Sequence, residues 1–253
     1  RPLSFNHMKK KIRVGIIFGG QSAEHEVSLQ SAKNIIDAID KEKYEIALIG
    51  IDKTGKWQLN DASQYLLNHN NPKLIKLNKE KSKELALVPG QGTRQLVALS
   101  DFQSEKPIDV AFPVLHGPFG EDGTVQGLLK LLDVPFVGPS VLGSAIGMDK
   151  DVMKRLLKAA ELPAADFISL DTGSDIDLDK IIEKLGLPIF VKPANLGSSV
   201  GVSKANNKKE LEAAIKEAFE YDNKILVEST IVGDEIECSV LGNENPIVSI
   251  PGR

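Results

Sequence analysis

One stretch of this sequence combines a lysine with a loop rich in glycine and serine. Residues 189–202 read Ile-Phe-Val-Lys-Pro-Ala-Asn-Leu-Gly-Ser-Ser-Val-Gly-Val, so an apolar run reaches Lys192 and a second run follows the loop. The pattern predicts strand, loop and strand. Backbone N–H groups beside the loop glycines and the hydroxyls of Ser198 and Ser199 would form a donor-rich cradle for a polyanion such as nucleotide phosphates. A surface hairpin with a solvated lysine explains this segment equally well.

A second lysine stands at the start of a predicted helix over residues 149–160. Asp149 is suited to cap that helix, and Lys150 follows it in the first turn. A cation there opposes the helix dipole, at a cost of up to about 1 kcal/mol, unless an anion lies nearby. Lys150 is therefore a candidate phosphate ligand, and an exposed lysine turned toward water is the alternative.

Two loops follow predicted strands and carry polar residues. Residues 21–28 contain Glu24 and come after a strand and Gly19-Gly20, and residues 116–124 begin with His116 and contain further glycines and acids. In doubly wound sheets, ligands bind beyond the carboxyl ends of the strands. Glu24 could hold a substrate ammonium group there, or could simply stabilise a helix N-terminus. The two glycines do not complete a dinucleotide-binding fingerprint.

Carboxylates also follow one another near the end of the chain. We predict strands at residues 224–228 and 235–241, which place Glu228 on the first and Glu235 and Glu237 on one face of the second. Such a face could bind a cation or sugar hydroxyls, or could be solvated. Cys238 is the single cysteine and is expected in the strand core; its isolation excludes an intrachain disulfide and fits a reducing cytoplasm.

The composition favours a globular protein of two domains. The chain has 253 residues and a formal net charge of −4, without the basic surplus of a nucleic-acid-binding protein. No apolar run approaches a membrane span, no signal peptide is evident, and no Cys/His cluster suggests zinc. Residues 1–8 resemble expression-vector sequence, so they are excluded from the fold prediction.

The predicted elements change character along the chain. We expect strands at residues 12–18, 44–51, 85–89, 96–100, 108–115 and 135–137, with helices at 27–39, 61–69 and 124–132. Helices at 149–160, 178–185 and 207–219 then alternate with strands that favour antiparallel pairing. The first half therefore predicts an α/β Rossmann-like domain and the second an α+β domain, with a boundary near Gly147.

Five segments together resemble one family. They are Gly-Gly-Gln-Ser-Ala-Glu-His-Glu-Val-Ser at 19–28, His-Gly-Pro-Phe-Gly-Glu-Asp-Gly-Thr-Val-Gln-Gly at 116–127, Met-Asp-Lys at 148–150, Val-Lys-Pro-Ala-Asn-Leu-Gly-Ser-Ser-Val-Gly at 191–201, and Val-Glu-Ser-Thr-Ile-Val-Gly-Asp-Glu-Ile-Glu at 227–237. Their content and order resemble the D-alanine–D-alanine ligases of the ATP-grasp superfamily, over about residues 12–242.

The resemblance implies a division of the chain. Residues 9–147 would form the Rossmann-like (pre-ATP-grasp) N-terminal domain that binds substrate, and residues 148–242 the small central ATP-grasp domain. Residues 243–253 would begin the C-terminal ATP-grasp domain, which we expect to be largely absent from this chain. The same resemblance suggests a cytoplasmic enzyme that forms a homodimer when complete, with no nucleic-acid or membrane partner.

The resemblance also implies roles for individual residues. Glu24 and Ser198 would act at the catalytic centre, where Glu24, His116, Ser198 and Ser199 would contact D-alanine. ATP would contact Lys150, Lys192, Ser198, Ser199, Glu228, Ser229, Ile231 and Glu235. Many relatives carry Lys or Glu at the position of Ser229, so the part that this side chain takes in adenine binding differs here.

The family's reaction would join two D-alanine molecules for peptidoglycan synthesis. ATP would convert the first carboxylate to an acyl phosphate, and the amine of the second D-alanine would then displace phosphate, with Mg²⁺ (or Mn²⁺) bound by residues expected beyond Arg253. This chain would then be incomplete and inactive by itself. A D-alanine–D-lactate or D-alanine–D-serine ligase, a silent nucleotide-binding fragment and, from Gly19-Gly20 alone, a nicotinamide-dependent oxidoreductase are the alternatives.

Overall fold

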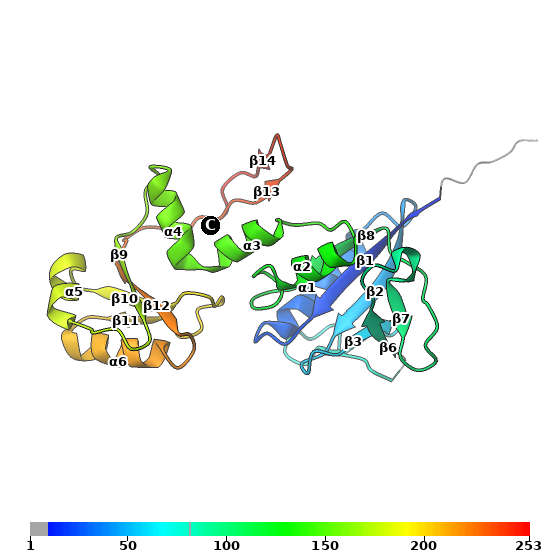
Figure 1. Cartoon of the computed structure of the whole chain (residues 1–253), viewed down its shortest axis with the longest axis horizontal. Coiled ribbons are helices and arrows are strands. Elements are labelled where there is room, and N and C mark those ends of the chain that lie inside the picture. The colour runs from blue at the N-terminus through cyan, green and yellow to red at the C-terminus, as the bar shows by residue number, and fades with distance from the viewer. Residues whose placement is uncertain (1–9, 81) are drawn as a thin grey trace, which may run out of the picture.

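The computed structural model describes residues 10–80 and 82–253 of the chain. Two larger β-sheets form separate bodies, and helices α3 (Val141–Met148) and α4 (Lys150–Ala159) lie between them (Figure 1). The predicted boundary at Gly147 falls inside α3 and stays a prediction. The candidate site lies where these two bodies meet.

The N-terminal sheet contains six strands in the order β7-β6-β3-β2-β1-β8. Their bounds are β1 (Ile12–Gly19), β2 (Tyr44–Ile51), β3 (Trp57–Asn60), β6 (Ser82–Leu87), β7 (Leu96–Ala98) and β8 (Val110–Val114). Strand β1 pairs in parallel with β2 and β8, and α1 (His25–Ala38) connects β1 to β2. The structure thus contains the predicted βαβ unit, while β3, β6 and β7 extend the sheet in antiparallel fashion.

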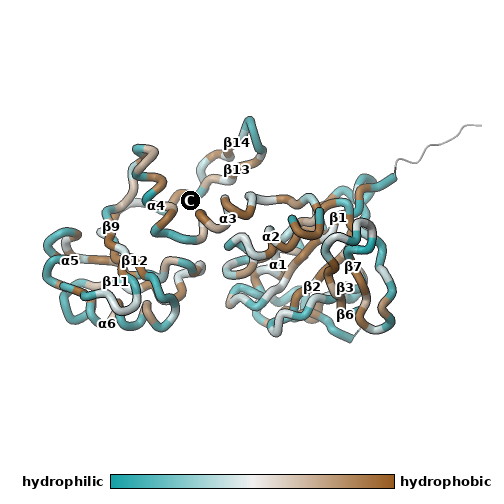
Figure 2. The backbone as a smooth tube through the Cα atoms, in the orientation of Figure 1, coloured by the Kyte–Doolittle hydropathy of each residue, from teal (hydrophilic) through white to brown (hydrophobic). Residues whose placement is uncertain are grey.

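Helices cover both faces of this sheet, which explains why its central strands are almost entirely apolar. Ile16 and Phe18 of β1 pack in the cluster that contains Leu29 of α1. Ile17, which points the other way, packs with Leu129 of α2 (Thr124–Leu131). Figure 2 shows the hydrophobic colouring concentrated along these strands. The carboxyl ends of β1 and β8 therefore project from a rigid, doubly covered core.

The prediction of a helix at residues 61–69 is wrong, because the structure has no helix there. The carboxylate of Asp61 accepts hydrogen bonds from the backbone N–H and hydroxyl of Ser63, at 2.7 and 2.5 Å. Such a local turn competes with helix formation. The segment continues into β4 (Leu66–Leu67), which pairs with β5 (Lys76–Leu77). The strands predicted at residues 85–89 and 96–100 correspond to β6 and β7, which pair as a hairpin with a short 3-10 helix, Gly92–Arg94, between them. Residues 135–137 contribute a bridge from Phe136 to Ala111 in place of a full strand.

The second sheet is antiparallel throughout, with the order β11-β10-β12-β9. Its strands are β9 (Phe167–Asp171), β10 (Ile189–Pro193), β11 (Ser203–Ala205) and β12 (Lys224–Ser229). Helices α5 (Leu178–Leu185) and α6 (Lys208–Ala218) share a hydrophobic core with inward residues such as Val191 and Val227. Strand alternation sends Lys192 and Glu228 to the opposite face. The second half has the predicted α+β character, although β9 and α3 were not foreseen.

The last segment differs from its prediction. The only regular strand in residues 235–241 is β13 (Val240–Leu241), which pairs with β14 (Ile247–Val248). Residues 231–253 are all exposed in the structure, so they have no core against which a longer strand could pack. The expectation that Cys238 lies in a strand core is therefore wrong, because Cys238 is exposed. In the part of the chain that the structure describes, the helices are too short or too polar to cross a membrane.

An ion pair with a buried carboxylate shapes the turn after β2. The carboxylate of Asp52 accepts hydrogen bonds from Thr54 and from the Lys56 backbone N–H, and it pairs with the Lys79 ammonium. Burial alone would raise the pKa of Asp52, but the hydrogen bonds from Lys79 and Thr54 outweigh it and hold that pKa well below its usual range. The turn carries Gly55 and leads into Trp57, which both line a pocket described below.

Replacing Asp52 by Asn should destabilise the protein by about 2 kcal/mol at neutral pH, because charge-assisted hydrogen bonds are lost. The folded state depresses the pKa of Asp52, so this stabilisation is complete above the ordinary pKa of about 4 and is lost as pH falls below it. Thermal unfolding between pH 7 and pH 3 should show the gap between wild type and Asp52→Asn closing only in acid. Asp40→Asn, which removes an exposed carboxylate paired with Lys43, is the control and should change stability much less. An Asp52→Asn gap that is as large at pH 3 as at pH 7 would contradict this account.

Candidate functional site

The two bodies touch through a hydrogen bond between Glu24 and Ser198. The Ser198 hydroxyl donates to Oε1 of Glu24, although the two residues are 174 positions apart in sequence. The backbone N–H of Glu24 donates to the Ser22 hydroxyl at 2.8 Å, which orients the loop before α1. A Cβ atom on Gly117 would lie 2.6 Å from Oε2 of Glu24, and one on Gly197 would lie 3.2 Å away. Both glycines thus leave room for the carboxylate, which lies at the junction of three loops.

The loop between β10 and β11 has an unusual backbone. Ser198 and Ser199 have φ angles of 48° and 58°, in the left-handed region that serine rarely adopts. Each such residue costs of the order of 1 kcal/mol, so surrounding contacts must hold it. Both serines are exposed, and their hydroxyls can therefore reach a ligand. The loop is hydrogen-bonded internally from the Val200 N–H to the Gly197 carbonyl at 3.1 Å.

Lys150 is hydrogen-bonded to the stem of this loop. Its Nζ donates to the carbonyl oxygens of Ala194, at 3.2 Å, and Leu196, at 2.5 Å, and its backbone N–H also donates to Ala194. Asp149 caps α4 as predicted, because its carboxylate accepts from the N–H groups of Asp151 and Val152. Burial, and then repulsion from Lys192, lower the pKa of the Lys150 ammonium. An anion placed here would relieve both penalties.

Lys192 contacts a buried carboxylate. Its Nζ lies 2.7 Å from Oε2 of Glu228, while Oε1 of the same carboxylate lies 3.2 Å from Nζ of Lys154. The structure therefore joins two predicted residues, Lys192 and Glu228, and adds one that the sequence reasoning missed. Lys154 stands four positions after Lys150, so both share one face of α4. That spacing was the available signal.

A cavity of about 470 Å³ lies between the bodies, beside this charged cluster. Lys150 and Gly197 line it from one body, Gly120 and Glu121 from the loop after β8, and Ser144 from α3. Cavities of several hundred cubic ångströms are typical of small-molecule sites. The arrangement places a desolvated cation, a glycine-serine loop and the crevice of the parallel strands around one space.

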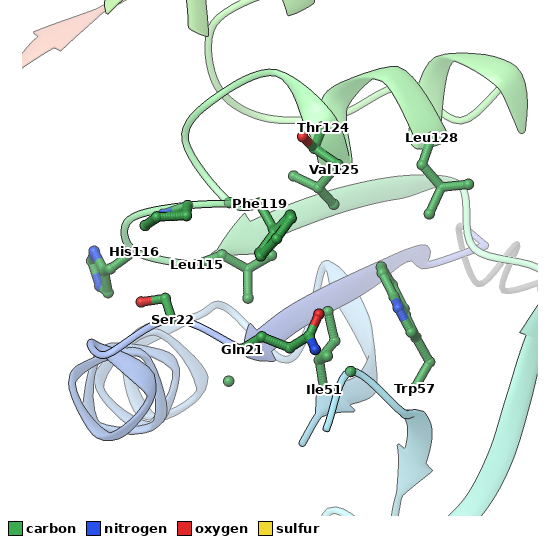
Figure 3. Close-up of a pocket in the computed structure, with 15 residues that line it drawn as sticks. Gln21, Ser22, Ile51, Trp57, Leu115, His116, Phe119, Thr124, Val125 and Leu128 are labelled. Carbon is green, nitrogen blue, oxygen red and sulfur yellow. The ribbon is translucent and has the colours of Figure 1, made fainter. Parts of the chain in front are cut away.

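His116 belongs to a neighbouring pocket of about 190 Å³. Figure 3 shows His116 beside Ser22 at one end of this pocket and Trp57 facing Leu128 at the other, with Phe119 between them. Nε2 of His116 hydrogen-bonds with the Ser31 hydroxyl of α1 at 3.0 Å. The histidine is therefore oriented from α1, close to the loop that carries Glu24.

The residues predicted to surround adenine and ribose are less closely gathered. Ser229 uses its backbone N–H and its hydroxyl to donate to the Asp166 carbonyl, at 2.9 and 3.3 Å. Ile231 and Glu235 are exposed. Within residues 10–80 and 82–253, no hydrogen bond or ion pair joins Glu235 to another residue. The structure thus places Glu228 beside Lys154 and Lys192, whereas Glu235 makes no polar contact with the described residues.

No metal site is formed by the described residues. Across residues 10–80 and 82–253, no group of three His, Cys, Asp or Glu side chains comes close enough to hold a metal ion. Magnesium is usually bound by one or two carboxylates together with substrate phosphates and water.

Comparisons with known proteins identify the family to which the chain belongs. The family model described as the D-ala D-ala ligase N-terminus matches residues 13–139, and the D-ala D-ala ligase C-terminus model matches residues 156–253. A D-alanine–D-alanine ligase of Oceanobacillus iheyensis is 57% identical over 249 residues, which are 97% of this chain and 67% of that protein. The chain belongs to the D-alanine–D-alanine ligase family. It spans about two thirds of the length of that relative.

Solved structures of ligases share the fold. The VanG D-Ala:D-Ser ligase from Enterococcus faecalis superposes with a TM-score of 0.85 at 35% identity, covering 96% of this chain and 69% of that one. The D-alanine–D-alanine ligase from Bacillus anthracis complexed with ATP gives a TM-score of 0.62 at 32% identity, covering 90% and 62%. The mixed α/β fold is that of the ligase family. The match of residues 156–253 to the C-terminus model does not confirm the expectation that a C-terminal ATP-grasp domain is largely absent.

Two glycine-to-alanine substitutions should have opposite effects on this ligase-family protein. Gly117→Ala should lower stability by about 1–2 kcal/mol, because Gly117 has φ +74° and the new methyl group would collide with Glu24. Gly127→Ala should raise it by up to about 1 kcal/mol, because Gly127 lies inside α2 and a Cβ added there would have no atom within 4 Å. Thermal unfolding measures both, and limited proteolysis should cleave the loop around Ser198 faster only in Gly117→Ala. Equal melting temperatures for the two variants would contradict the crowding of Glu24.

Proposed function

We propose that the protein binds ATP and D-alanine and forms D-alanyl-D-alanine, ADP and phosphate, as a step in peptidoglycan synthesis. The observation that carries this proposal is the convergence of Lys150, Lys192 and the Ser198-Ser199 loop beside a cavity that adjoins Glu24. A donor-rich, positively charged loop suits a triphosphate, and a carboxylate nearby suits the ammonium group of an amino acid. The ATP complex of the Bacillus anthracis ligase supports the choice of nucleotide.

The residues divide into two groups. Glu24 would accept hydrogen bonds from the ammonium group of the first D-alanine, while Ser198 holds the Glu24 carboxylate in place. His116 would lie near the carboxylate of the substrate. Lys150, Lys192 and Ser199 would hold the phosphates, with Glu228, Ser229, Ile231 and Glu235 around adenine and ribose. Mg²⁺, a homodimer and a cytoplasmic location remain expectations from the family.

The reaction transfers the γ-phosphoryl group of ATP to the substrate carboxylate, which gives an acyl phosphate and ADP. The amine of the second D-alanine then attacks the acyl carbon, and the tetrahedral intermediate expels phosphate and loses a proton. Little covalent chemistry falls to the protein. Its contribution is to position the reactants and to place cations where negative charge moves between oxygens.

A second candidate is a ligase that accepts D-serine in place of the second D-alanine. The similarity to the VanG D-Ala:D-Ser ligase favours it, because that structure covers the same residues with the same fold. Incubation of the complete enzyme with ATP and D-alanine, with and without D-serine or D-lactate, followed by mass analysis of the product, distinguishes the acceptors. D-alanyl-D-alanine as the main product supports the first proposal, and a mixed product at equal concentrations supports the alternative.

Removing either phosphate-facing lysine should weaken ATP binding. Lys150→Met and Lys192→Met should each raise the ATP dissociation constant by about tenfold or more, because a charge-assisted hydrogen bond is worth about 1.5–3 kcal/mol. Calorimetric titration measures the effect, and Lys184→Met, which removes an exposed lysine on α5, is the control. Unchanged ATP affinity in both variants, or stabilisation of the wild type by NAD in place of ATP, would refute the proposal.

A further inference from the structure

Lys154 is a buried cation to which the proposed reaction gives no role. Its side chain is 9% exposed, and its Nζ lies 3.2 Å from the Ala165 carbonyl and 5.4 Å from the centre of the Phe167 ring. A lysine ammonium is rarely buried unless it is paired, because its desolvation costs several kcal/mol. The partner here is the carboxylate of Glu228, whose side chain is 8% exposed.

The two oxygens of Glu228 have different surroundings. Oε1 is fully buried and receives no hydrogen bond, so its negative charge is met by the Lys154 ammonium at 3.2 Å. Oε2 lies 2.7 Å from Nζ of Lys192, whose side chain is more exposed, at 23%. One oxygen is therefore held from the helix side by a buried lysine, and the other by a lysine that borders open space.

The strand register explains this division. Lys192 of β10 lies opposite Leu226 of β12, so Glu228, two residues further on, is its diagonal neighbour on the same face. Phe167 of β9 lies directly opposite Glu228 on the other side. Lys154 reaches over Phe167 from α4 and meets the carboxylate from above the sheet. Lys154 and Lys192 thus approach the same carboxylate from different elements.

The ammonium group of Lys192 cannot pair closely with a phosphate and with Oε2 of Glu228 at the same time. If Lys192 turned toward a phosphate without replacement, a buried carboxylate would lose a partner, which is costly when no second cation remains. Lys154 remains in place as the ion-pair partner of Glu228 and keeps its carboxylate oriented. The released Oε2 is then free to accept a hydrogen bond.

We propose that Lys154 is a positioning residue that holds Glu228 for base recognition and so sets the preference for adenine over guanine nucleotides. This inference rests on the proposed function. Adenine carries an amino group, a donor, where guanine carries a carbonyl, an acceptor. A carboxylate whose Oε2 is free accepts a hydrogen bond from the amino group of adenine and repels the carbonyl oxygen of guanine. Lys192, which interacts with phosphates common to both nucleotides, contributes affinity without this discrimination.

Calorimetric titration of ATP and GTP against a set of variants tests the inference without relying on turnover. Lys154→Met should reduce the ratio of ATP to GTP affinity by about tenfold or more, since a hydrogen bond to an ionised group is lost or misdirected. Lys154→Arg, which keeps the charge, should retain most of the ratio. Lys158→Met, an exposed lysine one turn along α4, is the matched control and should leave the ratio unchanged. Lys192→Met should weaken both nucleotides and preserve the ratio.

A double-mutant cycle separates positioning from a general effect on folding. In a Glu228→Gln background, adding Lys154→Met should change the ratio no further, because Lys154 acts through that carboxylate. This pair also keeps the test valid if Lys154→Met alone does not fold, since the double variant removes both members of the buried pair and leaves only the more exposed Lys192 without its carboxylate. A further loss of selectivity in the double variant, or an unchanged ratio in folded Lys154→Met, overturns the inference while the proposed function stands. Failure of the wild type to bind ATP overturns both.

Discussion

The electrostatic balance around Glu228 is the constraint on which the rest of the site depends. Lys150, Lys154 and Lys192 approach one face of the second sheet from α4 and β10, with Lys154 buried and Lys150 and Lys192 partly exposed. Burial, and then repulsion from Lys192, lower the pKa of Lys150. Glu228 compensates part of this charge, and the remainder makes the site receptive to a polyanion. The fold of the second body can be understood as the frame that holds these four side chains together.

Packing on the other face of that sheet provides the frame. Strands β10 and β12 pair in antiparallel register and bury Val191 and Val227 against α5 and α6. Because side chains alternate along a strand, that burial fixes which residues face the cavity. A shift of one residue in register would exchange charged and apolar faces. Hydrophobic packing on one side therefore determines the electrostatics on the other.

The sequence was informative where local periodicity and chemistry agree. Lys192 ends an apolar strand, Ser198 and Ser199 follow a glycine, and Glu24 begins a helix after a buried strand, so their neighbourhoods could be predicted from short segments. The contact between Glu24 and Ser198 could not be derived from periodicity, because it joins loops of two different sheets; it followed only from the family resemblance. The only sequence signal for Lys154 was its spacing of four residues from Lys150, and this did not distinguish it from the other charged residues along an amphipathic helix.

The errors have similar physical causes. The predicted helix at residues 61–69 failed because the Asp61 side chain forms a local turn, which a pattern of polar and apolar residues does not register. The predicted strand at residues 235–241 alternates as a strand should, yet the structure provides no layer for it to cover. Helix α3 contains Gly143, Ser144 and Gly147, whose small side chains obscure its helical period.

The attachment of α4 determines which parts of the molecule can move as one piece. The backbone and side chain of Lys150 both bind the stem of the serine loop, and Asp149 pairs with Lys224 of β12 at 2.5 Å. Helix α4 is thus fixed to the second sheet, and α3 packs against it. Any movement of the second sheet relative to the first would carry α4 with it, whereas α3 also contacts α2 of the N-terminal body. The phosphate-facing lysines and the serine loop would then travel together as one rigid unit.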